Sequence, residues 1–201
     1  MASVAISSKD VSELRGRTGA GMMDCKRALE EAGGDMEKAA EILRKKGITK
    51  AEKRAGRTAS QGTVVSYIHH NGQVGVLVEL NSETDFVART DTFQQLARDI
   101  ALHVASADPI AVNPDDVPAE LIERERRIAE EQVAQEGKPE NIRSKIVDGK
   151  VKKFVAERTL TEQLFVRDDK KTVGQLIKEA SGKLGEVISV RRFARFKIGE
   201  V

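Results

Sequence analysis

The apolar residues of this chain change their spacing near residue 62, and that change constrains the fold more than any other feature. Before residue 48 they recur every three or four positions, as on one face of a helix, whereas from residue 62 to 80 many of them alternate. Asn71-Gly72 lies inside the alternating stretch and is the strongest short signal for a β-hairpin turn. The chain must combine a helical part with a strand part, which indicates the α+β class.

The first 47 residues predict three short helices. Ser7 or Ser8 can cap the first, a glycine-rich stretch separates it from a second that begins near Met22, and Asp35 can cap the third. Gly47 is expected to end the third helix, because glycine is the residue most often found just past a helix end. We therefore expect a three-helix domain over residues 1–47.

Residues 48–61 are basic and lack an apolar pattern, so they are expected to form a linker. Their cations are Lys50, Lys53, Arg54 and Arg57. This linker is also the one plausible signal for RNA or ribosome binding, although single-strand binders usually add stacking aromatic side chains, which it lacks. Direct nucleic-acid binding is therefore not expected, but it stays as the alternative function.

The remaining residues, 62–201, predict an antiparallel sheet with helices. A helix is expected to begin at Asp91 and to end before Pro109, and strand, helix and strand patterns begin near Leu164, Thr172 and Val187. Two highly charged helical runs between about 118 and 157 are separated by the short break EGKPEN, which predicts an antiparallel helical hairpin.

Composition narrows the function classes. The 34 basic and 32 acidic residues leave a net charge of +2, so no overall field selects nucleic acid as a partner. Cys25 is the only cysteine, which excludes an intrachain disulfide and an all-cysteine metal site. The sequence shows no membrane span and no signal peptide at its start, so a cytoplasmic protein without membrane contact is expected.

Residues able to perform chemistry are few. His69 and His70 are neighbours, so on a strand their side chains point to opposite faces and cannot bind one ion together. They are expected to be ordinary turn residues. His103 is expected to be a buried or rim histidine and not a base, and Cys25 is expected to be buried and inert. The glycines of GRTGAG follow no strand and precede no Gly-Lys-Ser or Gly-Lys-Thr, so they do not form a phosphate-binding Walker loop. We therefore expect no catalytic, metal or cofactor site.

Phe86 is the least expected residue of the chain, because it lies within the polar stretch NSETDFVART. The chain has only six phenylalanines and one tyrosine, so large rings are scarce. The pattern alone favours a core residue that pins the loop before the helix at Asp91, as in a hydrophobic staple. The other interpretation is an exposed ring that contacts a partner.

Two motifs carry a resemblance to a known family. The stretch ELRGRTGAGMMDCKRAL, followed after a linker and hairpin by NSETDFVAR, resembles the bacterial elongation factor Ts family. Three later stretches, EGKPENIRSKIVDGKVKKFVAE, TLTEQLFVRDDKKTVGQLIKE and VRRFARFKIGE, support the resemblance over nearly the whole chain.

The resemblance implies a fold and a function. The fold is a three-helix domain of the ubiquitin-associated type joined to an α+β dimerisation domain that carries a helical hairpin. The implied function is to bind elongation factor Tu loaded with GDP and to expel the nucleotide, leaving a nucleotide-free partner that can take up GTP. Such a protein is an exchange factor and not an enzyme with bond chemistry of its own.

The resemblance also implies which residues act. Thr84, Asp85, Phe86 and Val87 match the tip that displaces Mg²⁺ from the GTPase, with Asp85 and Phe86 reaching between its helices. Arg15, Met22 and Met23 match positions that dock on a surface helix of the partner. Two consecutive methionines cannot both face the interior of a small helical domain, so at least one is expected to be exposed.

Chain length points to the short form of the family. Longer members carry two copies of the hairpin-plus-helix unit, whereas this sequence contains one copy of GTVVSYIHHNGQVGVLVE. The short form acts as a homodimer, so the resemblance implies a dimer and a two-plus-two complex with elongation factor Tu.

Overall fold

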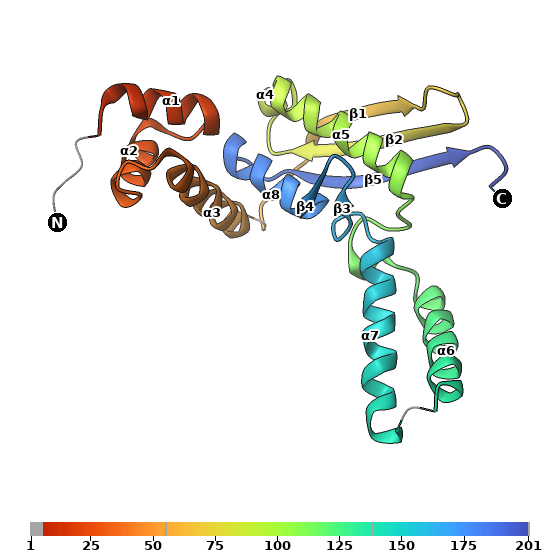
Figure 1. Cartoon of the computed structure of the whole chain (residues 1–201). Helices are drawn as coiled ribbons and strands as arrows, with labels where there is room; N and C mark the ends of the chain where they lie inside the picture. The colour runs from red at the N-terminus through yellow and green to blue at the C-terminus, as the bar shows by residue number, and fades with distance from the viewer. Residues whose placement is uncertain (1–5, 55, 138, 201) are drawn as a thin grey trace. The chain divides into compact units, whose positions relative to one another are not determined.

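The computed structural model describes residues 6–54, 56–137 and 139–200, with the Lys50 side chain outside the described part. Groups of helices and groups of strands follow one another along the chain in a mixed α+β arrangement (Figure 1). In chain order the elements are α1 (Ser8–Thr18), α2 (Met22–Glu31), α3 (Met36–Arg54), β1 (Gln61–Ile68), β2 (Val74–Ser82), α4 (Asp85–Ala88), α5 (Asp91–Ala107), the 3₁₀ turn η1 (Pro114–Asp116), α6 (Ala119–Gln135), α7 (Glu140–Arg158), β3 (Leu164–Phe165), β4 (Asp168–Thr172), α8 (Val173–Leu184) and β5 (Ser189–Lys197).

The chain divides into two compact units, each assembled from three separate segments. The first unit comprises Met1–Thr63, Leu80–Leu96 and Ile177–Ser189. The second comprises Val64–Glu79, Ala97–Leu176 and Val190–Val201. The domain boundaries expected at residues 47 and 62 stay a prediction.

Helices α1, α2 and α3 pack around one small core, whose fully buried members include Leu14, Cys25 and Leu29. The sequence signals for the starts of α1 and α3 are confirmed. Ser7 caps α1 with a reciprocal capping box, and the Asp35 carboxylate accepts hydrogen bonds from two backbone amides in the first turn of α3. The glycine-rich stretch is the turn between α1 and α2, as the sequence predicted.

The prediction that the third helix ends at Gly47 is wrong, because α3 continues to Arg54. Gly47 lies inside the helix where α8 crosses it, and a Cβ added at Gly182 of α8 would lie 2.7 Å from the Gly47 carbonyl carbon. Glycine here permits close approach of two helix backbones and does not mark a helix end. The first part of the expected linker is therefore helical.

Three strands form one sheet in the order β1-β2-β5. The predicted hairpin around Asn71-Gly72 is confirmed by β1 and β2, and Gly72 adopts the left-handed conformation that such a turn requires. Along β2, the alternating residues Val76, Val78 and Leu80 are buried.

A second, two-stranded sheet was only half predicted. Strand β3 pairs with β4 in antiparallel fashion, with Leu164 opposite Thr172. The sequence of β4, DDKKT, contains no apolar residue and was not expected to form a strand. Hydrogen bonds to a neighbouring strand hold such a polar segment without any side-chain signal.

Helix α5 begins at Asp91, as expected, and buries one face along its whole length. Its buried positions follow the helical period: Phe93, Leu96, Ala97, Ile100, Ala101 and Val104.

Helices α6 and α7 lie side by side (Figure 1) and share a narrow core. That core contains Ala129, Val133, Val147 and Val151. The remaining surface is strongly charged and includes an ion pair of 2.7 Å between Arg126 and Asp148. Among the described residues, no helix has both the length and the hydropathy needed to cross a membrane.

Candidate functional site

The stretch that contains Phe86 forms a single helical turn, α4, between β2 and α5. Thr84 occupies the cap position, and its hydroxyl accepts a hydrogen bond of 3.4 Å from the Val87 amide. Asp85 lies in the first turn, where a negative charge is favourable, and its carboxylate is 2.8 Å from the Arg89 guanidinium. We call residues 84–87 the tip segment.

Neighbouring hydroxyl groups satisfy backbone carbonyls of the tip segment. The Ser82 hydroxyl donates to the Thr84 carbonyl at 2.8 Å, and the Thr90 hydroxyl donates to the Val87 carbonyl at 2.8 Å. Both ends of the segment are therefore fixed by bonds from residues that flank it.

A residue far away in the sequence also holds the tip segment. The Glu186 carboxylate accepts hydrogen bonds from the Thr84 amide at 3.0 Å and from the Thr84 hydroxyl at 2.6 Å. In return, the Glu83 carboxylate accepts a bond of 2.8 Å from the Val187 amide. That bond, and then Arg57, hold the pKa of Glu83 below its usual value. Glu186 belongs to none of the motifs that pointed to the tip, and no sequence signal singled it out.

Phe86 is 79% exposed on this fixed turn, so the core interpretation of Phe86 is wrong. The ring buried near the start of α5 is Phe93, which is fully inaccessible. Within the tip segment, Thr84, Asp85 and Val87 are partly buried and only Phe86 is fully displayed to solvent. The arrangement presents one large apolar ring beside a carboxylate.

The other predicted contact residues lie on α1 and at the start of α2. Arg15 is exposed, Met22 is 44% exposed and Met23 is 65% exposed. The expectation that at least one methionine faces solvent is confirmed, and in fact both do. The α1–α3 core uses Cys25 and Leu29 in their place.

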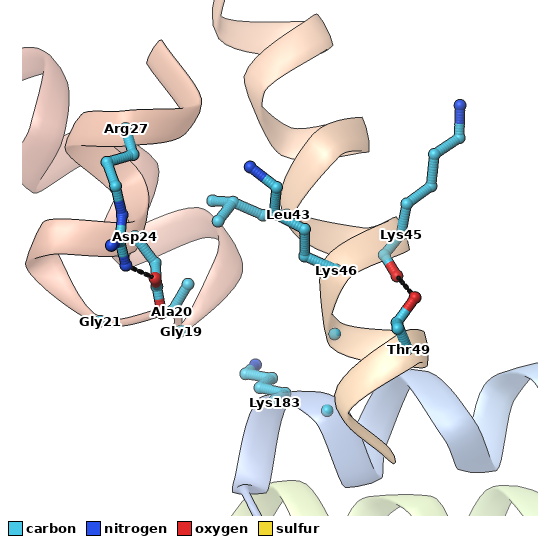
Figure 2. Close-up of a pocket in the computed structure, with 12 residues that line it drawn as sticks. Gly19, Ala20, Gly21, Asp24, Arg27, Leu43, Lys45, Lys46, Thr49 and Lys183 are labelled. Atoms are coloured by element: carbon cyan, nitrogen blue, oxygen red, sulfur yellow. Dashed lines mark hydrogen bonds and ion pairs between the residues drawn. The ribbon is translucent and has the colours of Figure 1, made fainter. Parts of the chain in front are cut away.

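A hollow of about 640 Å³ lies beside the turn between α1 and α2 (Figure 2). Its cationic lining residues are Arg27, Lys45, Lys46 and Lys183. Three of them already have acidic partners, because Arg27 pairs with Asp24, Lys45 with Glu41 and Lys46 with Glu31. These internal pairs leave the hollow poorly suited to a phosphate group.

The prediction that His69 and His70 point to opposite faces is wrong, because both lie beyond the end of β1 and their ring centroids are 4.2 Å apart. His103 and Cys25 show no catalytic arrangement. His103 is fully buried, and its Nε2 atom lies 3.0 Å from Gln163 Oε1. Burial lowers the pKa of His103, while the bond to Gln163 opposes that shift. Cys25 is buried in the α1–α3 core. Within the described ranges, no three or more His, Cys, Asp or Glu side chains are grouped to hold a metal ion.

The basic segment offers little support for RNA binding. Arg57 forms an ion pair of 3.4 Å with Glu83, and Arg54 is partly buried. The Lys50 side chain lies outside the described residues. Two of the four cations are thus drawn toward the protein itself.

One face of the three-stranded sheet is open and apolar. Ile68 of β1, Gly75 of β2 and Phe196 of β5 line one hollow of about 510 Å³. Because side chains alternate along a strand, Val64 and Leu77 lie on the same face as Ile68 and Gly75. We call this surface the open sheet face; its exposed apolar residues are Val64, Ile68, Leu77 and Phe196.

Comparison with known proteins identifies the family. A family model described as Elongation factor TS matches residues 24–200. Elongation factor Ts of Thermosipho melanesiensis is 56% identical over 195 residues, which cover 97% of this chain and 100% of the relative. The corresponding proteins of Carboxydothermus hydrogenoformans and Geobacter sulfurreducens are 56% and 54% identical, covering 97% and 98% of this chain and 90% and 91% of the relatives. The chain therefore belongs to the elongation factor Ts family, a family of translation elongation factors.

Proposed function

We propose that this protein is a cytoplasmic guanine-nucleotide exchange factor for elongation factor Tu. It binds the GDP-loaded partner, disturbs the Mg²⁺ and phosphate site, and leaves a nucleotide-free complex that then takes up GTP. The observation that carries the proposal is the exposed Phe86 beside Asp85, on a turn fixed by hydrogen bonds at both ends. Family membership supplies the partner.

Exchange of this kind needs no bond chemistry. A GTPase holds GDP through a phosphate-cradling loop and a Mg²⁺ ion. A factor that binds only when this site is distorted therefore lowers the affinity of the GTPase for GDP. The coupling is reciprocal, because GDP lowers the affinity of the GTPase for the factor by the same ratio. Each tenfold loss of GDP affinity requires about 1.4 kcal/mol of differential binding.

The tip segment and the N-terminal helices have separate roles in this proposal. Phe86 acts as a wedge whose full burial contributes about 1.5 to 3 kcal/mol, and Asp85 brings a negative charge toward the Mg²⁺ site. Thr84 and Val87 complete the turn that holds them. Arg15, Met22 and Met23 dock on a surface helix of elongation factor Tu, through a three-helix domain of the ubiquitin-associated type.

The test is release of fluorescent GDP from elongation factor Tu. Phe86→Ala is expected to slow release by about 10- to 100-fold, the equivalent of burying one ring, and Asp85→Asn is expected to slow it as well. Leu164→Ala is the control, because Leu164 is also an exposed apolar residue but lies on β3. Equal rates for Phe86→Ala and Leu164→Ala contradict the proposed wedge, and no acceleration by the wild-type protein contradicts the function.

We also propose that two copies of the chain associate through the open sheet face, so that the complex with elongation factor Tu contains two copies of each protein. An apolar face of this kind is costly to leave in water. The face also carries one positive and one negative side chain, because Arg192 pairs with Glu79 at 2.7 Å beside Leu77. Charges of both signs suit a surface that meets its own copy across a two-fold axis.

Light scattering tests the dimer. The wild-type protein is expected at twice the 22.0 kDa chain mass, and Phe196→Asp is expected to shift it toward the monomer. Leu164→Asp is the matched control and should leave the mass unchanged. A wild-type protein that scatters as a single 22.0 kDa chain at the protein concentrations of the exchange assay refutes the dimer.

A further inference from the structure

Two glutamates tie the tip segment to the chain that follows α8, in a reciprocal arrangement. Glu186 accepts hydrogen bonds from the amide and the hydroxyl of Thr84, at 3.0 and 2.6 Å. Glu83, the residue before Thr84, accepts a bond of 2.8 Å from the amide of Val187, the residue after Glu186. Each segment therefore supplies a carboxylate to a backbone amide of the other.

We propose that Glu186 is the positioning residue of the exchange tip: it holds Thr84 so that α4 forms before the partner binds. This inference rests on the proposed exchange function and deepens it. Glu186 does not contact the reacting site of the partner itself. It acts through Thr84, whose hydroxyl both donates to Glu186 and caps α4.

The need for such a residue follows from the length of α4. A helix of four residues has few internal hydrogen bonds to offset the cost of fixing its backbone, so it does not form by itself in water. Thr84 must be held in the extended cap conformation for its hydroxyl to meet the Val87 amide. Two bonds from one carboxylate fix both the backbone and the side-chain rotamer of Thr84.

Charge keeps the arrangement in place at neutral pH. The pKa of Glu83 is lowered by the Val187 amide and by Arg57, so this carboxylate stays ionised and continues to accept. Glu186 is partly buried, and its bonds are therefore less exposed to competition from water than those of a surface side chain.

A fixed tip changes the rate of exchange more than it changes initial docking. If α4 must form after contact, the cost appears in the step that displaces the nucleotide, whereas Arg15, Met22 and Met23 still dock. Loss of Glu186 is therefore expected to lower the GDP release rate at saturating factor by about tenfold, with less than about threefold change in the half-saturating concentration.

The experiment compares Glu186→Ala, Glu186→Gln and Glu179→Ala as full-length proteins. Glutamine keeps an oxygen that can accept from the Thr84 amide, so it should restore most of the rate. Glu179 lies on α8 and pairs with Arg44, so its removal deletes the same charge without touching the tip. Circular dichroism confirms that each variant is folded before rates are measured.

Hydrogen exchange of the Thr84 amide gives a readout that does not need the partner. In the free protein, Glu186→Ala should raise the exchange rate of this amide at least tenfold, and Glu186→Gln should raise it less. Thr84→Val removes the hydroxyl that Glu186 holds. The double variant with Glu186→Ala should therefore slow GDP release by much less than the product of the two single effects.

The outcomes separate the inference from the function it rests on. An active wild-type protein with an equally active Glu186→Ala variant overturns the positioning role alone, as does full additivity with Thr84→Val. If Glu179→Ala lowers the GDP release rate as much as Glu186→Ala does, the positioning role is also overturned. A wild-type protein that releases no GDP overturns the proposed function, and the positioning role with it.

Discussion

Replacing Gly182 with alanine tests whether α3 and α8 meet backbone to backbone. A Cβ at Gly182 would lie 2.7 Å from both the carbonyl carbon and the carbonyl oxygen of Gly47, and 2.9 Å from its Cα. These are backbone atoms inside a helix, so they cannot rotate away as a side chain could. The converse change is mild, because a Cβ at Gly47 would lie 3.7 Å from the Gly182 Cα, an ordinary contact.

The two substitutions together isolate the steric cost. Alanine in place of a helical glycine gains about 1 kcal/mol of helix propensity, and this gain is similar at both positions. At Gly182 the helices must also move apart by at least about 0.7 Å to restore ordinary contact, and overpacking of this kind costs about 1 to 3 kcal/mol. We expect Gly182→Ala to be less stable than Gly47→Ala by about 1 to 3 kcal/mol.

Urea denaturation followed by circular dichroism measures that difference. With a slope of about 1 to 3 kcal/mol per molar urea, the two midpoints should differ by roughly 1 M. Hydrogen exchange over residues 48–54 should also become faster in Gly182→Ala, since this part of α3 follows the crossing. The flanking Glu52–Lys178 pair is exposed and the Arg44–Glu179 pair is partly exposed, so neither can replace the lost contact.

If Gly182→Ala is as stable as Gly47→Ala, or more stable, the helices do not meet at these glycines. The helical propensity of the two sites would then account for both variants.

Two further predictions concern buried groups of this chain. Burial lowers the folded pKa of His103, so its stabilising contribution is complete above the unfolded value of about 6.5 and is lost as pH falls through that value toward the folded pKa. Nδ1 of His103 accepts a hydrogen bond from the Val166 amide, and Nε2 of His103 faces Gln163 Oε1. Protonation of Nδ1 would therefore place its N–H against the N–H of Val166. Urea midpoints should therefore fall more between pH 7.5 and 5 for the wild type than for His103→Gln, and equal losses contradict this. Phe93→Ala should lower the free energy of unfolding by about 3 to 5 kcal/mol, whereas Phe86→Ala should change it by less than about 0.5 kcal/mol; similar losses would show that the two rings do not differ in burial.

Local chemistry made several elements readable from the sequence. Ser7 and Asp35 cap helices because their side-chain oxygens reach backbone amides two or three residues away. The hairpin turn at Asn71-Gly72 could be predicted because Gly72 adopts the left-handed backbone conformation without strain. In each case the cause and the consequence lie within a few residues, so no knowledge of the fold is needed.

The errors arose where a distant segment decides the local structure. Glycine is common just past a helix end, which is why Gly47 was expected there. Instead α8 crosses α3 at Gly47, and the missing side chain lets the two helix backbones approach closely. Strand β4 has no apolar residue, and its structure depends on pairing with β3. The local sequence pattern cannot reveal either feature. The segment that packs on Gly47 lies more than 100 residues further along the chain, and β4 is held by backbone hydrogen bonds that do not depend on its side chains.

The tip shows the same division. The residues alone place a phenylalanine and an aspartate in a polar stretch between a hairpin and a helix, and the motif around them indicates the family. Folding places Phe93 in the core and leaves Phe86 in solvent, because burial depends on which side chains the packed elements enclose. It also brought Glu186 to Thr84 across 102 residues of sequence, a contact that no local pattern encodes since it exists only once the chain has folded.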